Sequence, residues 1–162
     1  MTTTHLPKSA EAVQKALHAK GLELTVVEVK ESARTAQEAA SAIGCEVAQI
    51  VKSLLFCTEN GKEPVLILAS GVNRVNEKRI EQQLGQKIVK ADPNFTRDVT
   101  GYAIGGVPPV GHKTVIEHIF IDEELLQHEK LWAAAGTPHT VFSFPSTALQ
   151  ELTGGKISSI KA

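Results

Sequence analysis

Lys52 is the side chain whose surroundings in the sequence most favour a chemical role. It lies in the apolar run 50–58, where a strand would place it on one face with Ile50, Leu54 and Phe56. A lysine with such neighbours either reaches the rim of a cavity or is partly desolvated, and desolvation lowers the pKa of an ammonium. The alternative is a lysine at a strand end, whose stem covers apolar surface while its ammonium reaches water.

The second candidate is the glycine-proline loop, which we define as residues 101–112. Gly105, Gly106 and Gly111 permit positive φ or close approach of a ligand, and Pro108-Pro109 restricts the backbone. A rigid loop with unpaired N–H groups suits a carbonyl or a phosphate. The loop matches neither a P-loop nor a dinucleotide-binding fingerprint. The alternative interpretation is a tight connection between a helix and a strand.

Two histidines and two cysteines complete the chemically interesting residues. His112 follows the glycine-proline loop and His139 precedes an apolar run, so either could position a ligand or move a proton near neutral pH. A structural role is the more common one for a single histidine. The histidines form no HExxH pattern, and there is no Gly-x-Ser-x-Gly elbow. Cys45 and Cys57 lack metal-ligand spacing and are interpreted as small buried side chains in a reducing compartment.

The elements that must position these residues form a mixed pattern. Thr35 to Glu38 matches a capping box that opens a helix over 36–43. The apolar runs 50–58 and 65–69 flank Asn60-Gly61, which predicts a central hairpin covered on both faces. We also expect helices from Ser9 to Gly21, over 76–84, 93–100, 122–135 and 145–152, and strands over 24–29, 87–90, 115–121 and 140–144. Strands in a hairpin and strands alternating with helices predict an α+β (mixed α/β) fold with a mixed sheet.

Composition narrows the class of protein. The 162 residues are enough for one domain, 1–162, with a core that needs no disulfide or metal. No apolar run is long enough to span a bilayer and no signal peptide is evident, so we expect a cytoplasmic protein without a membrane partner. The net charge of −1 argues against an extended nucleic-acid footprint. It allows contact with the last few nucleotides of an RNA.

Several segments, in their order along the chain, resemble the YbaK/ProX family. The match covers nearly the whole chain and is carried by residues 35–40, 43–44, 50–56, 105–112, 136–139 and 148–154. The family is related to the editing insertion domain of bacterial prolyl-tRNA synthetases. The resemblance implies a mixed, partly barrel-like β-sheet surrounded by helices. It also implies a trans-editing hydrolase that deacylates mischarged aminoacyl-tRNA without a metal, a cofactor or a covalent intermediate.

The resemblance also assigns residues to the site. The essential lysine of the family falls on Lys52 and its Gly-x-x-x-Pro motif on 105–109, so the expected catalytic residues are Lys52, Gly105 and Gly106. The expected substrate-binding residues are Thr35, Ser53, Val107, Pro109, Gly111, His112 and His139. Lys52 is expected to be an anchor rather than a base, because the sequence shows no second cation close to it. Some relatives carry Asn or Thr where this chain has Ser53, which bears on the amino acid accepted.

We therefore expect the 3′ end of an aminoacyl-tRNA as partner, carrying a small amino acid on tRNA(Pro), with a prolyl-tRNA synthetase as a further candidate partner. A second, size-selecting site is needed because one methylene gives a synthetase only about 1–3 kcal/mol of discrimination. The alternative is a non-catalytic module of the same fold that binds a tRNA end, a nucleotide or a synthetase.

Overall fold

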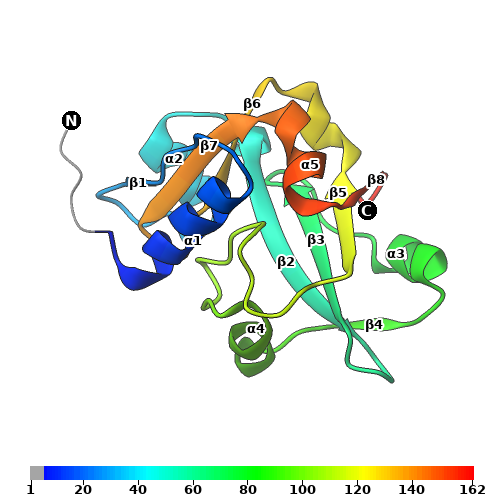
Figure 1. The fold of residues 1–162 in the computed structure, drawn as a ribbon. Coiled ribbons are helices and arrows are strands. Elements are labelled where there is room, and N and C mark those ends of the chain that lie inside the picture. The colour runs from blue at the N-terminus through cyan, green and yellow to red at the C-terminus, as the bar shows by residue number, and fades with distance from the viewer. Residues whose placement is uncertain (1–5) are drawn as a thin grey trace.

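The sheet of this protein is mixed and is flanked by helices, as Figure 1 shows for the computed structural model, which describes residues 6–162. The strand order is β1-β7-β6-β2-β3-β5-β8, with β4 also paired to β2. The pairs β2–β6, β3–β5 and β5–β8 are parallel and the others antiparallel. The strands are β1 Val27–Glu28, β2 Ile50–Thr58, β3 Pro64–Ser70, β4 Ile88–Lys90, β5 His118–Asp122, β6 Lys130–Ala134, β7 Thr140–Pro145 and β8 Lys156–Ser158. This confirms the predicted mixed sheet.

The helices begin and end largely where the local sequence indicates. Thr35 caps the second helix through a bond from the Glu38 N–H to its hydroxyl, 3.1 Å long. The Glu38 carboxylate accepts from Ser32 instead of closing the predicted box. The first helix follows Pro7 without a side-chain cap, so Ser9 is not its N-cap. The helices are α1 Lys8–Ala19, α2 Ala36–Ile43, α3 Glu77–Leu84, α4 Pro93–Thr100 and α5 Leu149–Thr153, with 3-10 turns η1 Val47–Gln49, η2 Glu123–Gln127 and η3 Ser146–Ala148.

The helix predicted over 122–135 is wrong. Only the short η2 forms there, and β6 follows it. Leu131 and Ala133 are buried while Lys130 is exposed, an alternation with the period of a strand. Pairing with β2 and β7 satisfies the backbone of β6, and this tertiary context overrides the helical propensity of its alanines. Three smaller differences remain. The strand predicted over 24–29 shortens to β1, and the strand predicted over 115–121 begins only at His118. The helix predicted over 145–152 divides into η3 and α5.

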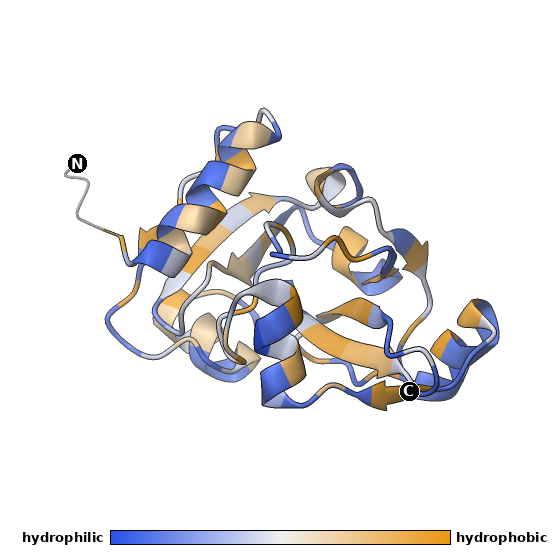
Figure 2. Cartoon of the chain, turned by 60° about the horizontal axis from the view of Figure 1, so that its bottom comes forward, coloured by the Kyte–Doolittle hydropathy of each residue, from blue (hydrophilic) through white to orange (hydrophobic). Residues whose placement is uncertain are grey.

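The two faces of the sheet are covered differently. One face packs in a single cluster against α1, α5 and the glycine-proline loop. On the other face, one cluster lies under α2 and a separate one under α3. In Figure 2 the central strands are largely apolar, while the helices alternate apolar and polar residues. The division of the second face leaves the middle of β2 between two apolar clusters, and Lys52 lies there.

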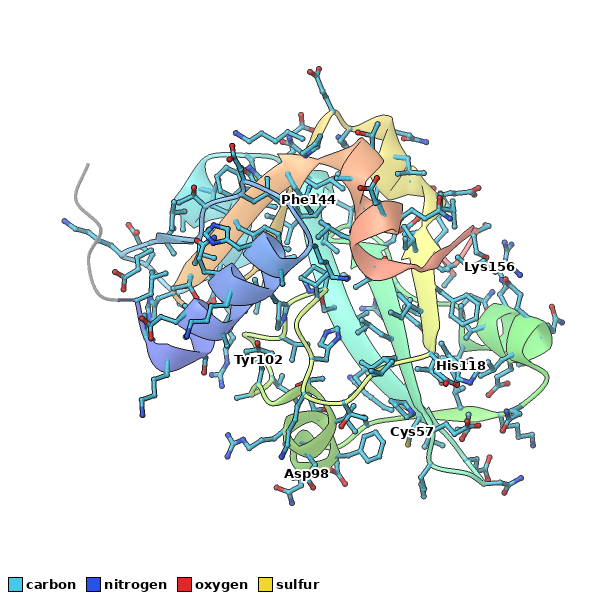
Figure 3. The ribbon with its side chains drawn as sticks, in the orientation of Figure 1. Cys57, Asp98, Tyr102, His118, Phe144 and Lys156 are labelled. Atoms are coloured by element: carbon cyan, nitrogen blue, oxygen red, sulfur yellow. The ribbon has the colours of Figure 1, made fainter. Side chains whose placement is uncertain are left out.

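The predicted burial of the cysteines holds for one of the two. Cys57 is buried in β2, near the lower end of the sheet in Figure 3, whereas Cys45 is only half-buried after α2. Neither forms a disulfide. Within the described residues, no helix is both long and apolar enough to cross a membrane.

Candidate active site

The edge of β2 opposite β3 is interrupted in its middle. β6 pairs there with Ile50 and Val51, and β4 pairs with residues 56–58. The Ala91 N–H donates to the Leu55 carbonyl. Among residues 6–162, no strand therefore pairs with Ser53 on this edge.

The phase of the β2–β3 ladder sets the direction of the Ser53 backbone. The bonds from Gly71 N–H to Ile50 O and from Thr58 N–H to Glu63 O turn the even-numbered residues of β2 toward β3. The N–H and C=O of Ser53 therefore point into the interruption. Its Oγ is buried and has no hydrogen-bond partner among the described residues. Buried polar atoms are normally paired, so this one is a candidate contact for a ligand.

A cavity of about 660 Å³ lies at this interruption, a volume typical of small-molecule sites. Its walls come from the start of α2, the middle of β2, the segment between β3 and α3, β4 and β6, and the glycine-proline loop. Apolar side chains form much of the wall. The charged side chains that line it, within the described part of the chain, are Arg34, Lys52, Arg74, Glu77 and Lys90. Cations therefore outnumber carboxylates by four to one.

Lys52 is half-buried in this cavity. Its Nζ donates to the main-chain carbonyl of Asn73 at 2.6 Å. Burial, and secondarily the Arg74 guanidinium, lower the pKa of Lys52, while the Asp122 carboxylate opposes them. The sequence-based expectation that no second cation lies near Lys52 is thus wrong, because the segment that follows β3 places Arg74 close to Lys52.

The glycine-proline loop contributes a short stretch to the cavity. Gly105 and Val107 line the wall, and neither N–H has a hydrogen-bond partner among the described residues. Gly105 has φ +96°, and a Cβ there would lie 2.8 Å from Arg34 Cγ, so the arginine packs directly on the glycine. The Gly106 N–H donates to Ala103 O, which corrects the expectation that it is a free donor.

The rest of the loop holds its own shape. His112 Nε2 donates to Pro108 O at 2.7 Å and the Tyr102 hydroxyl to Gly111 O at 3.0 Å (Tyr102 is labelled in Figure 3). Burial lowers the pKa of the half-buried His112, although its bond to Pro108 opposes this. These contacts make His112 a support of the loop.

A second predicted segment, 136–139, meets the loop away from the cavity. The Gly136 N–H donates to Gly106 O at 2.8 Å. A Cβ on Gly106 would lie 2.8 Å from the Gly136 carbonyl carbon, so the two backbones are in direct contact. His139 is exposed and its Nδ1 lies 3.2 Å from Glu31 O. Of the predicted residues, Thr35, Lys52, Ser53, Gly105 and Val107 line the cavity, whereas Gly106, Pro109, Gly111, His112 and His139 do not.

Sequence reasoning missed three cations of the cavity. Arg34, Arg74 and Lys90 lie far apart in the chain and belong to none of the motifs, so no spacing marked them. The available signal was that each flanks a predicted element boundary. Within residues 6–162, no group of three or more His, Cys, Asp or Glu side chains could hold a metal ion.

Comparisons with known proteins show which family this chain resembles. The profile of the aminoacyl-tRNA editing domain matches residues 30–152. The uncharacterized protein YwhH of Bacillus subtilis (strain 168) is 31% identical over 132 residues, 82% of this chain and 83% of that protein. The proline–tRNA ligase of Limosilactobacillus fermentum is 34% identical over 97 residues, which are 57% of this chain but 17% of the ligase.

Among solved structures, a crystal structure proposed to be that of a trans-editing enzyme for prolyl-tRNA synthetase is 45% identical, with a TM-score of 0.91. The alignment covers 98% of this chain and 99% of that one. The residues that carry the resemblance in the sequence, around Lys52 and Gly105, fall inside the matched region. The chain therefore belongs to the aminoacyl-tRNA editing domain family, related to the editing domain of prolyl-tRNA synthetase.

Proposed function

We propose that this protein is a trans-acting deacylase, which hydrolyses the ester between a wrongly attached amino acid and the 3′ end of a tRNA. The observation that carries the proposal is the cavity around Lys52, where four cations and one carboxylate gather in a chain whose net charge is −1. Such local charge suits the phosphates at one end of an RNA, whereas a long duplex would need a more basic protein. The related proteins named for prolyl-tRNA support tRNA(Pro) as the carrier.

The reaction asks little of the protein beyond positioning and charge stabilisation. Water adds to the ester carbonyl carbon, the bond from that carbon to the ribose oxygen breaks, and the ribose oxygen ends with a proton from water. The products are a free amino acid and a tRNA with a free terminal hydroxyl. The N–H groups of Gly105 and Val107, which lack protein partners among the described residues, are the proposed donors to the oxyanion. Lys52 is the proposed charged anchor for the terminal ribose or phosphate.

The interrupted edge of β2 is the proposed seat of the amino acid. The Ser53 carbonyl points into the cavity and suits an α-ammonium, and its unpaired Oγ offers a further polar contact. The neighbouring Ile50, Leu54 and Trp132 form an apolar wall that favours a small side chain. Such a pocket rejects larger side chains by volume, which is the task of an editing site.

Three broader expectations accompany the proposal. Residues 1–162 act as one domain, and the protein works in the cytoplasm, where tRNA is charged. A prolyl-tRNA synthetase supplies part of the binding contacts to the tRNA. The third follows from the small size of the basic cavity, since few phosphates can be neutralised there.

A deacylation panel tests the function. The full chain is incubated with tRNA(Pro) charged with alanine, cysteine, serine, threonine or proline, beside Lys52→Ala and the control Lys156→Ala, whose lysine is exposed on β8 outside the cavity. We expect hydrolysis of one or more small amino acids, lost in Lys52→Ala and kept in Lys156→Ala. Hydrolysis of none would favour the non-catalytic binding module. Hydrolysis that Lys52→Ala leaves intact would refute the proposed role of Lys52.

A further inference from the structure

The acceptor of the Lys52 ammonium is a main-chain carbonyl, that of Asn73, in the segment 71–76 between β3 and α3. A main-chain acceptor holds a fixed position only when its segment is fixed. The same segment carries Arg74, the second cation at Lys52. What immobilises residues 71–76 therefore determines the geometry of two cavity cations.

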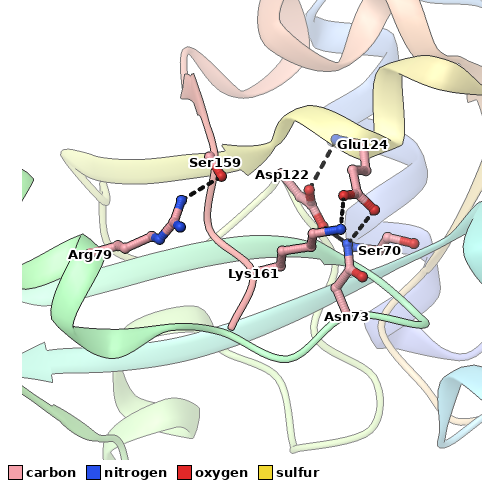
Figure 4. Close-up of polar contacts among 7 residues, drawn as sticks. All are labelled: Ser70, Asn73, Arg79, Asp122, Glu124, Ser159 and Lys161. Carbon is pink, nitrogen blue, oxygen red and sulfur yellow. Dashed lines mark hydrogen bonds and ion pairs between the residues drawn. The ribbon is translucent and has the colours of Figure 1, made fainter.

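The Asn73 side chain ties this segment to the end of β5. Its Nδ2 donates to Asp122 Oδ2 at 2.8 Å and to Glu124 Oε1 at 3.0 Å, as Figure 4 shows. Asp122 is only 1% exposed and also accepts from the N–H groups of Ser70 and Glu124, so its carboxylate is held by several contacts. One amide thus holds two carboxylates together and fixes its own main chain beside them. Loss of the amide would leave a buried carboxylate with an unmet acceptor site.

Residues 160–162 hold the segment from its other side. Lys161 Nζ pairs with Glu124 Oε2 at 2.6 Å, and Val75 forms a β-bridge with Lys161. The Ala162 N–H donates to Arg74 O and the Asn76 N–H to Ile160 O. The main chain of residues 74–76 is thus hydrogen-bonded to residues 160–162, and the Asn73 side chain is hydrogen-bonded to the end of β5. The Asn73 carbonyl, which accepts from Lys52, lies between these two points of attachment.

We propose that Asn73 is a positioning residue, whose side-chain amide fixes the carbonyl that orients the Lys52 ammonium in the cavity. Asn73 contacts Lys52 through its main-chain carbonyl, and it acts on the substrate only through Lys52. The kinetic consequence rests on the proposed deacylase function; the orientation of Lys52 does not. The charged groups around Lys52 are Arg74, Glu77, Asp122, Arg34 and Lys90.

The first test is independent of activity. NMR of the full chain with 13C-labelled lysine gives the pKa of Lys52, whose signal is identified by its absence in Lys52→Met. Asn73→Ala is expected to lower that pKa further, because an ordered carbonyl acceptor favours the ammonium form. Arg79→Ala is the matched control, since the Arg79 guanidinium donates to Ser159 Oγ at 2.7 Å and so links α3 to the residue just before 160–162, without a bond to the Asn73 side chain. An unchanged pKa in a folded Asn73→Ala protein, or an equal shift in Arg79→Ala, would overturn the proposal.

The second test uses deacylation kinetics. Asn73→Ala is expected to reduce kcat/KM about tenfold, the effect of one well-placed hydrogen bond. In the Lys52→Met background the same substitution should have little further effect, because both changes act through one ammonium. A full tenfold loss in that background would show that Asn73 acts elsewhere. If the alanine variant does not fold, Asn73→Ser replaces it, because serine keeps a hydrogen-bond donor in a turn position. The pKa of Lys52 and kcat/KM should then change in the same direction as expected for Asn73→Ala. If the natural chain hydrolyses no substrate, the proposed function fails and the NMR result alone decides this inference.

Discussion

Replacing Lys52 by methionine removes the ammonium and keeps an unbranched side chain in the cavity. Within residues 6–162 this ammonium has one hydrogen-bond acceptor, Asn73 O at 2.6 Å, so its remaining N–H groups can bind the substrate. A hydrogen bond from a charged group contributes about 1.5–3 kcal/mol. At 1.4 kcal/mol for each factor of ten, we expect kcat/KM to fall about 10- to 150-fold. Lys52→Arg keeps the charge but changes the geometry and should fall between the two proteins.

The pH dependence of kcat/KM separates an anchor from a base. Burial and Arg74 lower the pKa of Lys52 below its ordinary value of about 10.4. An anchor must be charged, so the rate should decline as the pH rises through that lowered pKa. A base must be neutral, so the rate would increase over the same interval. The assay is deacylation of charged tRNA(Pro) from neutral to alkaline pH, with the spontaneous hydrolysis of the ester subtracted.

Two results would contradict the role of Lys52 as a charged anchor. A Lys52→Met protein with unchanged kcat/KM would show that the ammonium does not contact the transition state. A rate that increases with pH in the natural chain, and loses that increase in Lys52→Met, would make Lys52 the base. Lys156→Ala, changed at an exposed lysine of β8, should follow the natural profile throughout.

Three other substitutions test the frame of the site. Gly106→Ala should destabilise the fold by about 1–3 kcal/mol, because its Cβ would lie 2.8 Å from backbone atoms, whereas Gly61→Ala, with ordinary contacts, should melt nearly as the natural chain. His112→Ala removes the bond to Pro108 O and should lower stability by about 1–2 kcal/mol. Because burial lowers the pKa of His112, the unfolded chain binds a proton at this side chain at a higher pH than the folded chain does. The contribution of His112 to stability should therefore decline as the pH falls below about 6.5. In thermal melts the alanine variant should lack that pH dependence. Thr35→Ala removes the α2 cap and should cost about 1 kcal/mol, measured by urea unfolding; an unchanged midpoint would contradict the capping role.

Local sequence signals were enough to predict the helix caps, the central hairpin and the family. The cap at Thr35 forms as predicted, and Asn76 and Asp92 cap α3 and α4 in the same way, because a cap needs only a side chain and a backbone N–H a few residues away. The Asn60-Gly61 turn joins two central strands for a similarly local reason. The ordered motifs also indicated the family, which the comparisons confirm.

Which residues come into contact depends on long-range pairing that local patterns do not contain. β6 exists because β2 and β7 supply its hydrogen bonds, although its sequence resembles a helix. Arg34, Arg74 and Lys90 line one cavity because the start of α2, the segment after β3 and the end of β4 meet around the middle of β2, an arrangement that no local pattern records. Lys52 illustrates both the local signals and the long-range contacts. Its apolar neighbours predicted partial desolvation, whereas its acceptor and its second cation come from a turn some twenty residues away, and only folding brings that turn beside it.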